Sequence, residues 1–180
     1  MKIMVRADDL GYSRGVNYGI YDTVKKGVIK NIGFMVNMPD SVDGYELVKD
    51  LDICLGQHTN VCIGTPISDP KLIPSLVDEN GQFKSSRTYR QSKEDFVVLE
   101  EAIIEIEAQY ERFKEMVENA HDDGCDLLVC HPGYLDAQIL RTSSLTLDRT
   151  KEAEMLCSKE LKDYLKEHDI HLYTYDEIGH

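Results

Sequence analysis

Three short polar segments of this sequence carry residues that could perform chemistry. In the first, Asp8 and Asp9 directly follow residues 2–7, a short apolar run that favours a β-strand. Two adjacent carboxylates at a strand end repel each other unless they bind a cation or share a proton. A hard divalent metal is the simplest explanation of the pair. The alternative is that one of them, together with Ser13, caps the following helix.

The other two segments each contain a histidine. His58 follows a predicted strand at residues 53–58, and a neutral imidazole nitrogen there could complete a metal site with a carboxylate. Residues 131–134 read His-Pro-Gly-Tyr, and the proline and glycine force a sharp turn that aims His131 above the sheet. A lone histidine can equally have a structural role. Because all three segments follow strands, we expect them to converge at one end of the fold.

The elements that must position these residues alternate along the chain. We predict strands at residues 2–7, 28–38, 53–58, 126–130 and 170–175, and helices at residues 15–26, 42–51, 92–120 and 149–168. Such alternation is typical of parallel β/α proteins, whose functional residues lie at the carboxyl ends of the strands. Five strands are too few for an eight-stranded barrel. The fold is therefore an open sheet, or part of a barrel is missing.

Two long segments separate these units. Residues 61–91 hold three prolines and no periodicity, which predicts an extended loop over one end of the fold. Residues 92–120 show a long amphipathic helical pattern that is rich in glutamate, and we expect the glutamate face to be solvated. The apolar positions of this pattern are Phe96, Leu99, Ile103, Ile106, Tyr110, Phe113 and Val117.

Composition limits the classes of function. The 180 residues suit one domain, and the net charge of −13 opposes binding to nucleic acid or to an anionic membrane surface. A neutral or cationic small substrate fits better. No apolar run approaches the roughly 20 residues needed to cross a bilayer, and the first residues lack a signal-peptide pattern, so we expect a cytoplasmic protein. The five cysteines show no metal-binding spacing and are expected to be reduced thiols.

Taken together, four ordered motifs resemble the YdjC-like carbohydrate deacetylases, the family that includes chitooligosaccharide deacetylase. They are RADDLGYS at residues 6–13, LGQHTN at 55–60, PSLVDENGQF at 74–83 and CHPGYLD at 130–136. Residues 149–156 also resemble the closing helix of that family. The resemblance implies an α/β fold that is parallel and barrel-like, a distorted or incomplete TIM-like barrel, with residues 1–180 forming a single domain.

The resemblance also implies a reaction. A divalent metal, magnesium or zinc, would be held by Asp9 and His58, with Asp8 as the base that activates water. His131 would be the acid or the group on the oxyanion side. The substrate would be a small N-acetylated sugar or oligosaccharide, and the products acetate and a free amine.

Further expectations concern substrate contacts and assembly. Tyrosines at positions 12 and 134 could stack on a sugar ring, and packing is the alternative for each. Together with Asn60 of the LGQHTN motif, Tyr12 and Tyr134 are the candidate substrate-binding residues. We expect no nucleic-acid or membrane partner, and a homodimer is a further expectation.

One departure from the family pattern bears on activity. The resemblance implies a histidine-bearing strand between the long helix and residues 126–130, and this chain lacks it; the missing segment would fall near residues 114–120. His121 has the right order in the sequence but a helical context. Either the segment has been lost, or the sequence joins residues that are not adjacent in the whole protein. We favour the second, because a parallel barrel without central strands exposes edges and core.

Two other functions compete with the deacetylase. A non-catalytic, carbohydrate-binding member of the family would keep the fold and an incomplete metal site. A phosphoacceptor domain of the flavodoxin-like type would use Asp8 and Asp9 as a magnesium pocket. The latter needs an aspartate after its third strand and a lysine after its fifth, where this chain has His58 and His131.

Overall fold

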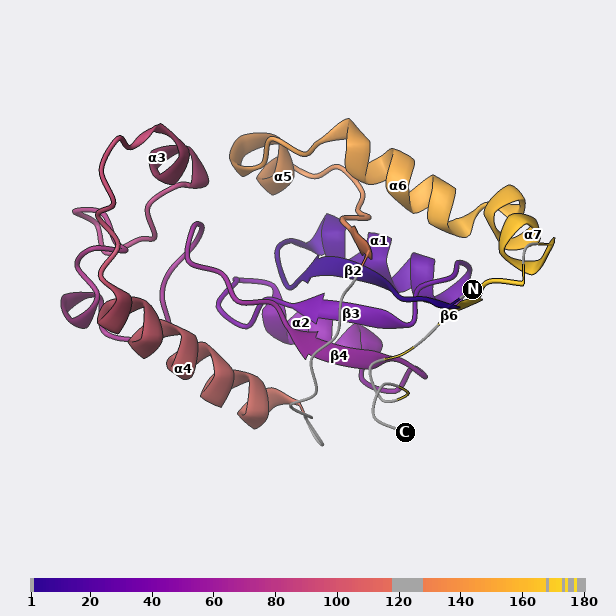
Figure 1. Ribbon diagram of the computed structural model, residues 1–180, viewed down its shortest axis with the longest axis horizontal. Coiled ribbons are helices and arrows are strands. Elements are labelled where there is room, and N and C mark those ends of the chain that lie inside the picture. The colour runs from indigo at the N-terminus through magenta and orange to yellow at the C-terminus, as the bar shows by residue number, and fades with distance from the viewer. Residues whose placement is uncertain (1, 118–127, 168, 173, 175–176, 178–180) are drawn as a thin grey trace.

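A parallel β-sheet lies at the centre of the computed structural model, which describes residues 2–117, 128–167, 169–172, 174 and 177. Four strands pair in the order β4-β3-β2-β5, and a separate parallel pair joins β1 to β6 (Figure 1). The strands are β1 Lys2–Ile3, β2 Val5–Leu10, β3 Asn31–Phe34, β4 Cys54–Gln57, β5 Leu128–Cys130 and β6 His171–Leu172. Every pairing is parallel, so the carboxyl ends of β2 to β5 share one edge.

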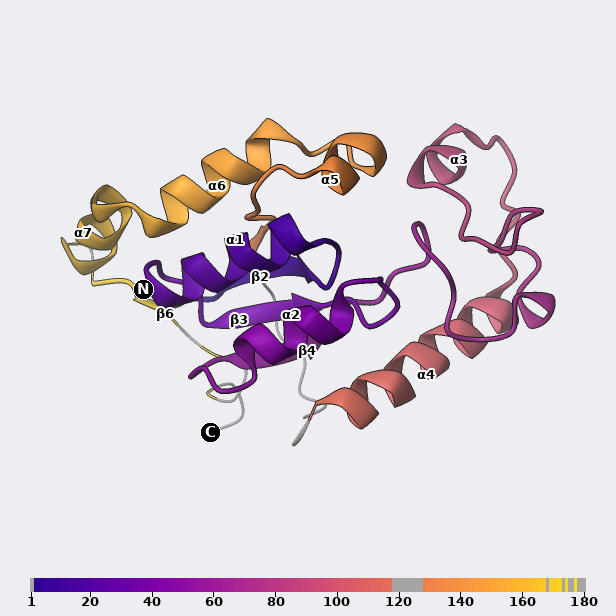
Figure 2. The ribbon, with the colours of Figure 1, turned by 180° about the vertical axis from the view of Figure 1, so that it is seen from behind.

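Helices cover one face of this sheet and extend beyond it. Helices α1 and α2 lie side by side across that face, and α6 packs next to α1 (Figure 2). The helices are α1 Arg14–Lys25, α2 Ser41–Val48, α3 Ser86–Gln91, α4 Leu99–Met116, α5 Ala137–Thr142, α6 Leu147–Cys157 and α7 Lys159–Glu167, with a 3-10 turn η1 at Pro70–Leu72.

Local sequence explains how α1 begins and which face it buries. The Ser13 side chain accepts a hydrogen bond from the Val16 amide, which satisfies one of the free N–H groups of the first turn. Val16 and Ile20, four residues apart, are fully buried in the main core with Ile32 of β3. The predicted helix at residues 15–26 is thus confirmed, and so is the cap at Ser13.

The barrel expectation is met only at the level of fold class. Parallel α/β structure is confirmed, but the described residues form an open sheet and show no closed barrel. Strand bounds also differ from the prediction: residues 2–7 continue to Leu10, and residues 28–38 contain only the four strand residues of β3. Hydrogen bonding to neighbouring strands sets these limits, and apolar composition alone does not reveal it.

The segment at residues 61–91 contains more structure than the predicted loop. It holds η1 and α3, and Val77 pairs with Phe83 in an isolated antiparallel bridge. Ile73 and Leu76, both fully buried, join these two residues in a second small core. This structure was not predicted, because the prolines interrupt the hydrophobic periodicity of the segment without preventing the burial of its apolar side chains.

The C-terminal helix prediction was wrong in its continuity. The helix predicted at residues 149–168 is divided, within the described residues, into α6 and α7. The two helices are separated at Ser158, whose hydroxyl accepts a hydrogen bond from the Leu161 amide. Helix α5 was not predicted. It begins at Asp136, whose carboxylate accepts hydrogen bonds from the amides of Gln138 and Ile139.

Helix α4 is oriented differently from the prediction. It starts at Leu99 rather than at residue 92, and Phe113 is buried as expected. However, Glu105 of the supposedly solvated face is 0% exposed, while Ile103 and Ile106 of the apolar face are 43% and 41% exposed. Glu105 accepts hydrogen bonds from the amides of residues 67 and 68, so backbone contacts have decided the orientation. Within the described part of the chain, no helix is long and apolar enough to span a membrane.

Candidate active site

The acidic pair lies inside strand β2, not after it. The pairing of β2 with β3 shifts between Ala7 and Leu10, which is an irregularity of the β-bulge kind. Within this irregularity Asp9 has φ 75°, a left-handed conformation that non-glycine residues rarely adopt. Such a conformation costs about 1–3 kcal/mol, and residues that adopt it cluster at active sites. The bulge sends the two carboxylates in different directions.

Asp8 points toward the β3 side and is held by Arg6. The side chains of these two residues lie on the same face of β2, with Nε to Oδ1 at 2.5 Å and Nη2 to Oδ2 at 2.9 Å. Asp8 is only 2% exposed. A Cβ at Gly33 of β3 would lie 2.0 Å from Asp8 Oδ1, so the position of Asp8 requires a glycine there.

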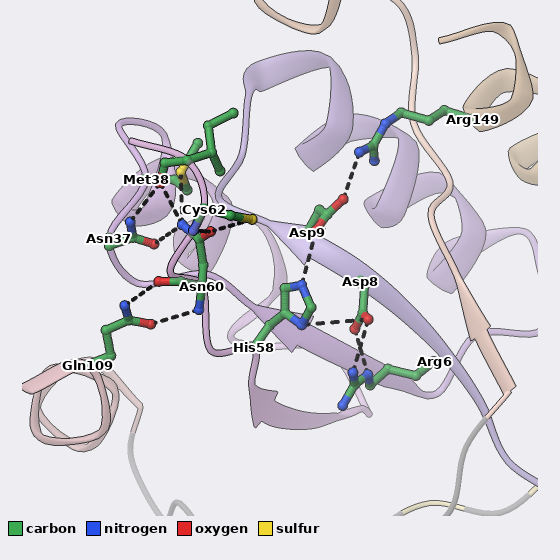
Figure 3. Close-up of polar contacts among 11 residues, drawn as sticks. Arg6, Asp8, Asp9, Asn37, Met38, His58, Asn60, Cys62, Gln109 and Arg149 are labelled. Atoms are coloured by element: carbon green, nitrogen blue, oxygen red, sulfur yellow. Dashed lines mark hydrogen bonds and ion pairs between the residues drawn. The ribbon is translucent and has the colours of Figure 1, made fainter. Parts of the chain in front are cut away.

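His58 lies between the two carboxylates. Its backbone N–H extends the β3 pairing by donating to Phe34 at 2.9 Å, which fixes the residue just beyond β4. Its Nδ1 is 3.6 Å from Asp8 Oδ2 and its Nε2 is 3.3 Å from Asp9 Oδ1 (Figure 3). One imidazole therefore joins the two aspartates, as the predicted convergence requires.

Arg149 of α6 completes the cluster from a distant part of the chain. Its Nη2 donates to Asp9 Oδ2 at 2.7 Å, and the side chain is 2% exposed. Two guanidinium groups thus neutralise two carboxylates. This corrects the argument from repulsion: the acidic pair does not by itself require a metal, because Arg6 and Arg149 already compensate its charge.

The charges of the cluster shift the titration of its members. Burial raises the pKa of Asp9, but the hydrogen bond from His58 and the charges of Arg149 and His58 outweigh burial, and the net pKa falls from 3.8 to about 2. For His58, burial lowers the pKa, yet the hydrogen bond to Asp9 and the charges of Asp8 and Asp9 raise it overall. Asp9 is therefore an anion at neutral pH.

Asp9 and His58 have the spacing of two ligands of one metal ion. Ligand atoms about 2.1 Å from an ion lie about 3.0 Å apart at octahedral angles and about 3.4 Å apart at tetrahedral ones. The 3.3 Å between Asp9 Oδ1 and His58 Nε2 fits this range, and it also fits a hydrogen bond. The described residues contain no group of three or more such ligands, and His121 lies outside them. The described residues thus bring two candidate metal ligands together.

Asn60 lies near the cluster but is used within the protein. Its side-chain amide donates to Ile63 O at 2.7 Å and to Asn37 Oδ1 at 3.0 Å, and its Oδ1 accepts from the Cys62 amide at 3.1 Å (Figure 3). The side chain of Gln109 in α4 accepts a hydrogen bond from the Asn60 backbone N–H and donates one to the Asn60 backbone carbonyl. The structure therefore places Asn60 as a support of the loop after β4.

The hydroxyl groups of the two candidate tyrosines form hydrogen bonds to residues other than Asp9 and His58. Tyr12 is 5% exposed; its ring lies against the Arg149 guanidinium at 5.4 Å, and its hydroxyl contacts Thr142 at 2.9 Å. Tyr134 is exposed, but its hydroxyl donates to Asp22 of α1 at 2.7 Å. Tyr12 thus packs on a site residue, and Tyr134 is not brought into the cluster.

His131 follows β5 next to the acidic pair. The register pairs Cys130 with Ala7, so the next residue lies beside Asp8 along the neighbouring strand. The backbone N–H of His131 donates to Glu152 Oε2 at 2.5 Å. Among the described contacts its imidazole has none with Asp8, Asp9 or His58. The structure thus brings His131 to the same edge but not into the cluster.

Sequence reasoning missed three members of the site. Arg6 stands two residues before Asp8, and the two-residue period of a strand could have placed both on one face. Gly33, in the middle of an apolar strand, is a signal for close approach. Arg149 is 140 positions from Asp9, and no local pattern links the two.

Comparison with known protein families places the chain in one of them. The model of the YdjC-like protein family matches residues 2–124, a stretch that includes Asp8, Asp9 and His58. The chain belongs to the YdjC-like family. Membership supports the resemblance in the motifs and leaves the phosphoacceptor alternative without support.

Individual relatives extend the match beyond residue 124. A protein of Thermoanaerobacter pseudethanolicus named carbohydrate deacetylase is 32% identical over 98% of this chain and 70% of its own length. A Brevibacillus brevis protein of the same name is 26% identical over 99% of this chain and its full length. That alignment runs over 254 positions, 74 more than the 180 residues of the chain.

A solved structure agrees in fold. The crystal structure of a putative cellobiose-phosphate cleavage protein from Enterococcus faecalis superposes with a TM-score of 0.87 over 98% of both chains. Sequence identity is 20%, so this likeness concerns the fold alone. The YdjC-like chain shares that overall architecture.

Proposed function

We propose that this YdjC-like protein is a metal-dependent hydrolase that removes acetyl groups from N-acetylated sugars or oligosaccharides. The observation that carries the proposal is the facing pair of Asp9 Oδ1 and His58 Nε2, 3.3 Å apart at the carboxyl ends of β2 and β4. The names of the relatives supply the substrate class. The family and the geometry thus support one site and one reaction class.

In this proposal Asp9 and His58 hold the ion. A bound magnesium or zinc ion would supply polarisation of the acetyl carbonyl and lower the pKa of water. Arg149 contributes by occupying Asp9 Oδ2, which leaves Oδ1 directed toward His58. Arg149 is thus a positioning residue that fixes which oxygen of Asp9 is available.

Asp8 has two roles in this proposal. The resemblance assigns it the part of the base that takes a proton from water. Its contacts with Arg6 and with His58 Nδ1 also suit a carboxylate that orients the histidine, as the partners of metal-binding histidines commonly do. Asp8→Asn keeps the shape and removes the charge. A base role predicts a fall in kcat with metal affinity intact, whereas an orienting role predicts that metal affinity falls as well.

His131 is proposed as the group that gives a proton to the leaving amine. Its place beside Asp8 at the strand ends supports this, and closure over a substrate would have to bring its imidazole nearer. His131→Asn should then lower kcat while the affinity for metal stays unchanged.

A completed barrel belongs to the same proposal. The Brevibacillus alignment has 74 positions more than the chain, which is long enough for further β/α units between α4 and β5. The intact mass of the protein purified from its natural source tests this. A mass well above 20.5 kDa indicates further residues, and a mass of 20.5 kDa would end the barrel proposal.

Acetate release tests the function itself. The purified chain is incubated with an N-acetylated chitooligosaccharide, with and without added magnesium or zinc, and acetate is measured enzymatically. We expect metal-stimulated release that falls at least about 1,000-fold in Asp9→Asn and in His58→Ala, because the ion loses half of its described ligands. Asp52→Asn, which changes an exposed carboxylate paired with Lys30, is the matched control and should keep full activity.

One observation favours a second candidate. Only two metal ligands are found together in the described residues, which suits a carbohydrate-binding protein without catalysis. Such a protein would bind the oligosaccharide in calorimetry and release no acetate under any metal condition. That result would overturn the hydrolase and leave sugar binding as the function.

A further inference from the structure

The turn after β5, which carries His131, is fixed to helix α6 through its backbone. The N–H of His131 donates to Glu152 Oε2 at 2.5 Å, and the N–H of Gly133 donates to Arg149 O at 3.1 Å. Pro132 lies between them and has no N–H to donate. The Glu152 carboxylate therefore holds the turn at the point where the chain leaves β5.

Helix α1 packs against the same turn. The N–H of Tyr134 donates to Gly15 O at 3.0 Å, and a Cβ at Gly19 would lie 2.4 Å from Gly133 Cα. Position 19 thus requires a glycine, because the backbone of the turn lies directly on the helix. Contacts with two helices fix the backbone of the turn, so the imidazole of His131 moves by rotation about a fixed Cα.

One turn of α6 connects two parts of the candidate active site. Arg149 and Glu152 are three residues apart, which places them on the same face of the helix. Arg149 donates to Asp9 Oδ2 at 2.7 Å (Figure 3), and Glu152 accepts from the backbone of His131. Asp9 and His131 belong to different strand ends. Helix α6 therefore sets the place of one relative to the other.

We propose that Glu152 is a positioning residue that holds His131 within reach of the leaving amine. This inference rests on the proposed function, in which His131 gives a proton to that amine. As the C–N bond of the N-acetyl group breaks, its electron pair moves to nitrogen, which takes a proton from the protonated imidazole of His131. Water supplies the second oxygen of the acetate. Glu152 acts only through the backbone of His131 and does not touch the substrate.

Position and charge predict opposite results for two conservative changes. Glu152→Gln keeps the length of the side chain and an acceptor oxygen, but removes the charge. Glu152→Asp keeps the charge and shortens the side chain by one methylene group, so the acceptor withdraws from the His131 amide. If Glu152 positions His131, the shorter side chain is the harmful one, because a displacement of about 1 Å in a reacting group can cost about 100-fold in rate.

Acetate release from an N-acetylated chitooligosaccharide measures both variants, with the whole protein and added metal. Glu152→Asp should lower kcat about 100-fold, while KM and the affinity for metal stay unchanged. Glu152→Gln should keep kcat close to that of the original protein. Glu154→Asp makes the same change at an exposed position of α6 and is the matched control, which should keep full activity.

A double-variant cycle separates positioning from general support of the structure. In a His131→Asn protein, the further change Glu152→Asp should cause no additional loss of kcat, because there is no proton donor left to position. A structural role would instead multiply the two losses. Multiplied losses would overturn the inference, as would full activity of Glu152→Asp or equal impairment of Glu152→Asp and Glu152→Gln.

Failure of the proposed function has a different signature. An original protein that releases no acetate under any metal condition contradicts the hydrolase itself, and the inference on Glu152 falls with it. An original protein that releases acetate, together with a Glu152→Asp protein that releases it equally fast, contradicts the inference alone.

Discussion

The buried carboxylates of this YdjC-like chain are stabilised in two different ways, one near β2 and one in α4. Asp8 and Asp9 face the cations Arg6 and Arg149 and share His58, and Asp9 adopts a strained backbone conformation. Glu105 of α4 is as deeply buried, yet none of the described cations contacts it. Amide N–H groups, the Ser68 hydroxyl and Gln109 satisfy it instead.

This difference distinguishes the candidate active site around Asp9 from Glu105, which supports a loop. Glu105 has an ordinary helical backbone, and all of its partners belong to the loop it holds or to its own helix. Asp9 Oδ1 faces His58 Nε2 at 3.3 Å, a distance that a metal ion can bridge. The backbone of Asp9 is left-handed, which is rare for a residue other than glycine. Burial of a carboxylate alone is thus a weaker indication of a functional site than burial combined with an unusual backbone conformation and a facing histidine.

The largest expected effect concerns the cation that compensates Asp9. Arg149→Met removes the charge and leaves a buried carboxylate without its ion pair, which should lower the free energy of unfolding by about 3–5 kcal/mol. Urea denaturation measures this, and Arg149→Lys is the matched control that keeps the charge. A loss below about 1 kcal/mol would show that Asp9 does not depend on Arg149.

Glu105→Gln should have a smaller effect of another kind. The amide has one acceptor oxygen where the carboxylate has two, so at least one donor of residues 67–68 loses its partner, at about 1–3 kcal/mol. Hydrogen exchange should rise at those amides while the acetate assay changes little. Loss of acetate release in a folded Glu105→Gln protein would contradict the division between site and support.

The smallest expected change in stability tests the packing of Asp8. Gly33→Ala places a methyl group against Asp8 Oδ1 and should cost about 1–2 kcal/mol, because the carboxylate must move away from its position beside Arg6 and His58. Ile32→Val on the same strand costs a similar amount without touching the site. Acetate release should fall in the first variant only, and equal activities would show that the position of Asp8 is not critical.

Sequence patterns predicted those parts of the fold that depend on local signals. The helix after Ser13 and the convergence of the acidic pair with His58 follow from capping, periodicity and the common edge of parallel strands. The orientation of α4 could not be predicted, because its glutamates accept hydrogen bonds from a loop 26 to 38 residues away, and periodicity alone assigned them to solvent. The partnership of Arg149 with Asp9 has the same cause.

The proximity of Asp8, Asp9 and His58 could be predicted from the sequence, whereas the other partners of these side chains could not. Residue type and strand ends were sufficient for Asp8, Asp9 and His58, since those features are local. The substrate contacts of Tyr12, Asn60 and Tyr134 stay predictions. The tertiary hydrogen bonds of these side chains to Thr142, Ile63 and Asp22 could not be read from local sequence.

Metal binding by calorimetry tests the central claim most directly. Zinc or magnesium is titrated into the original protein, Asp9→Asn, His58→Ala and Glu105→Gln, all below their unfolding temperatures. The account predicts one bound ion in the original protein and in Glu105→Gln, and an affinity at least about tenfold weaker in the other two. Unchanged binding in both Asp9→Asn and His58→Ala, or no binding by the original protein, would contradict it.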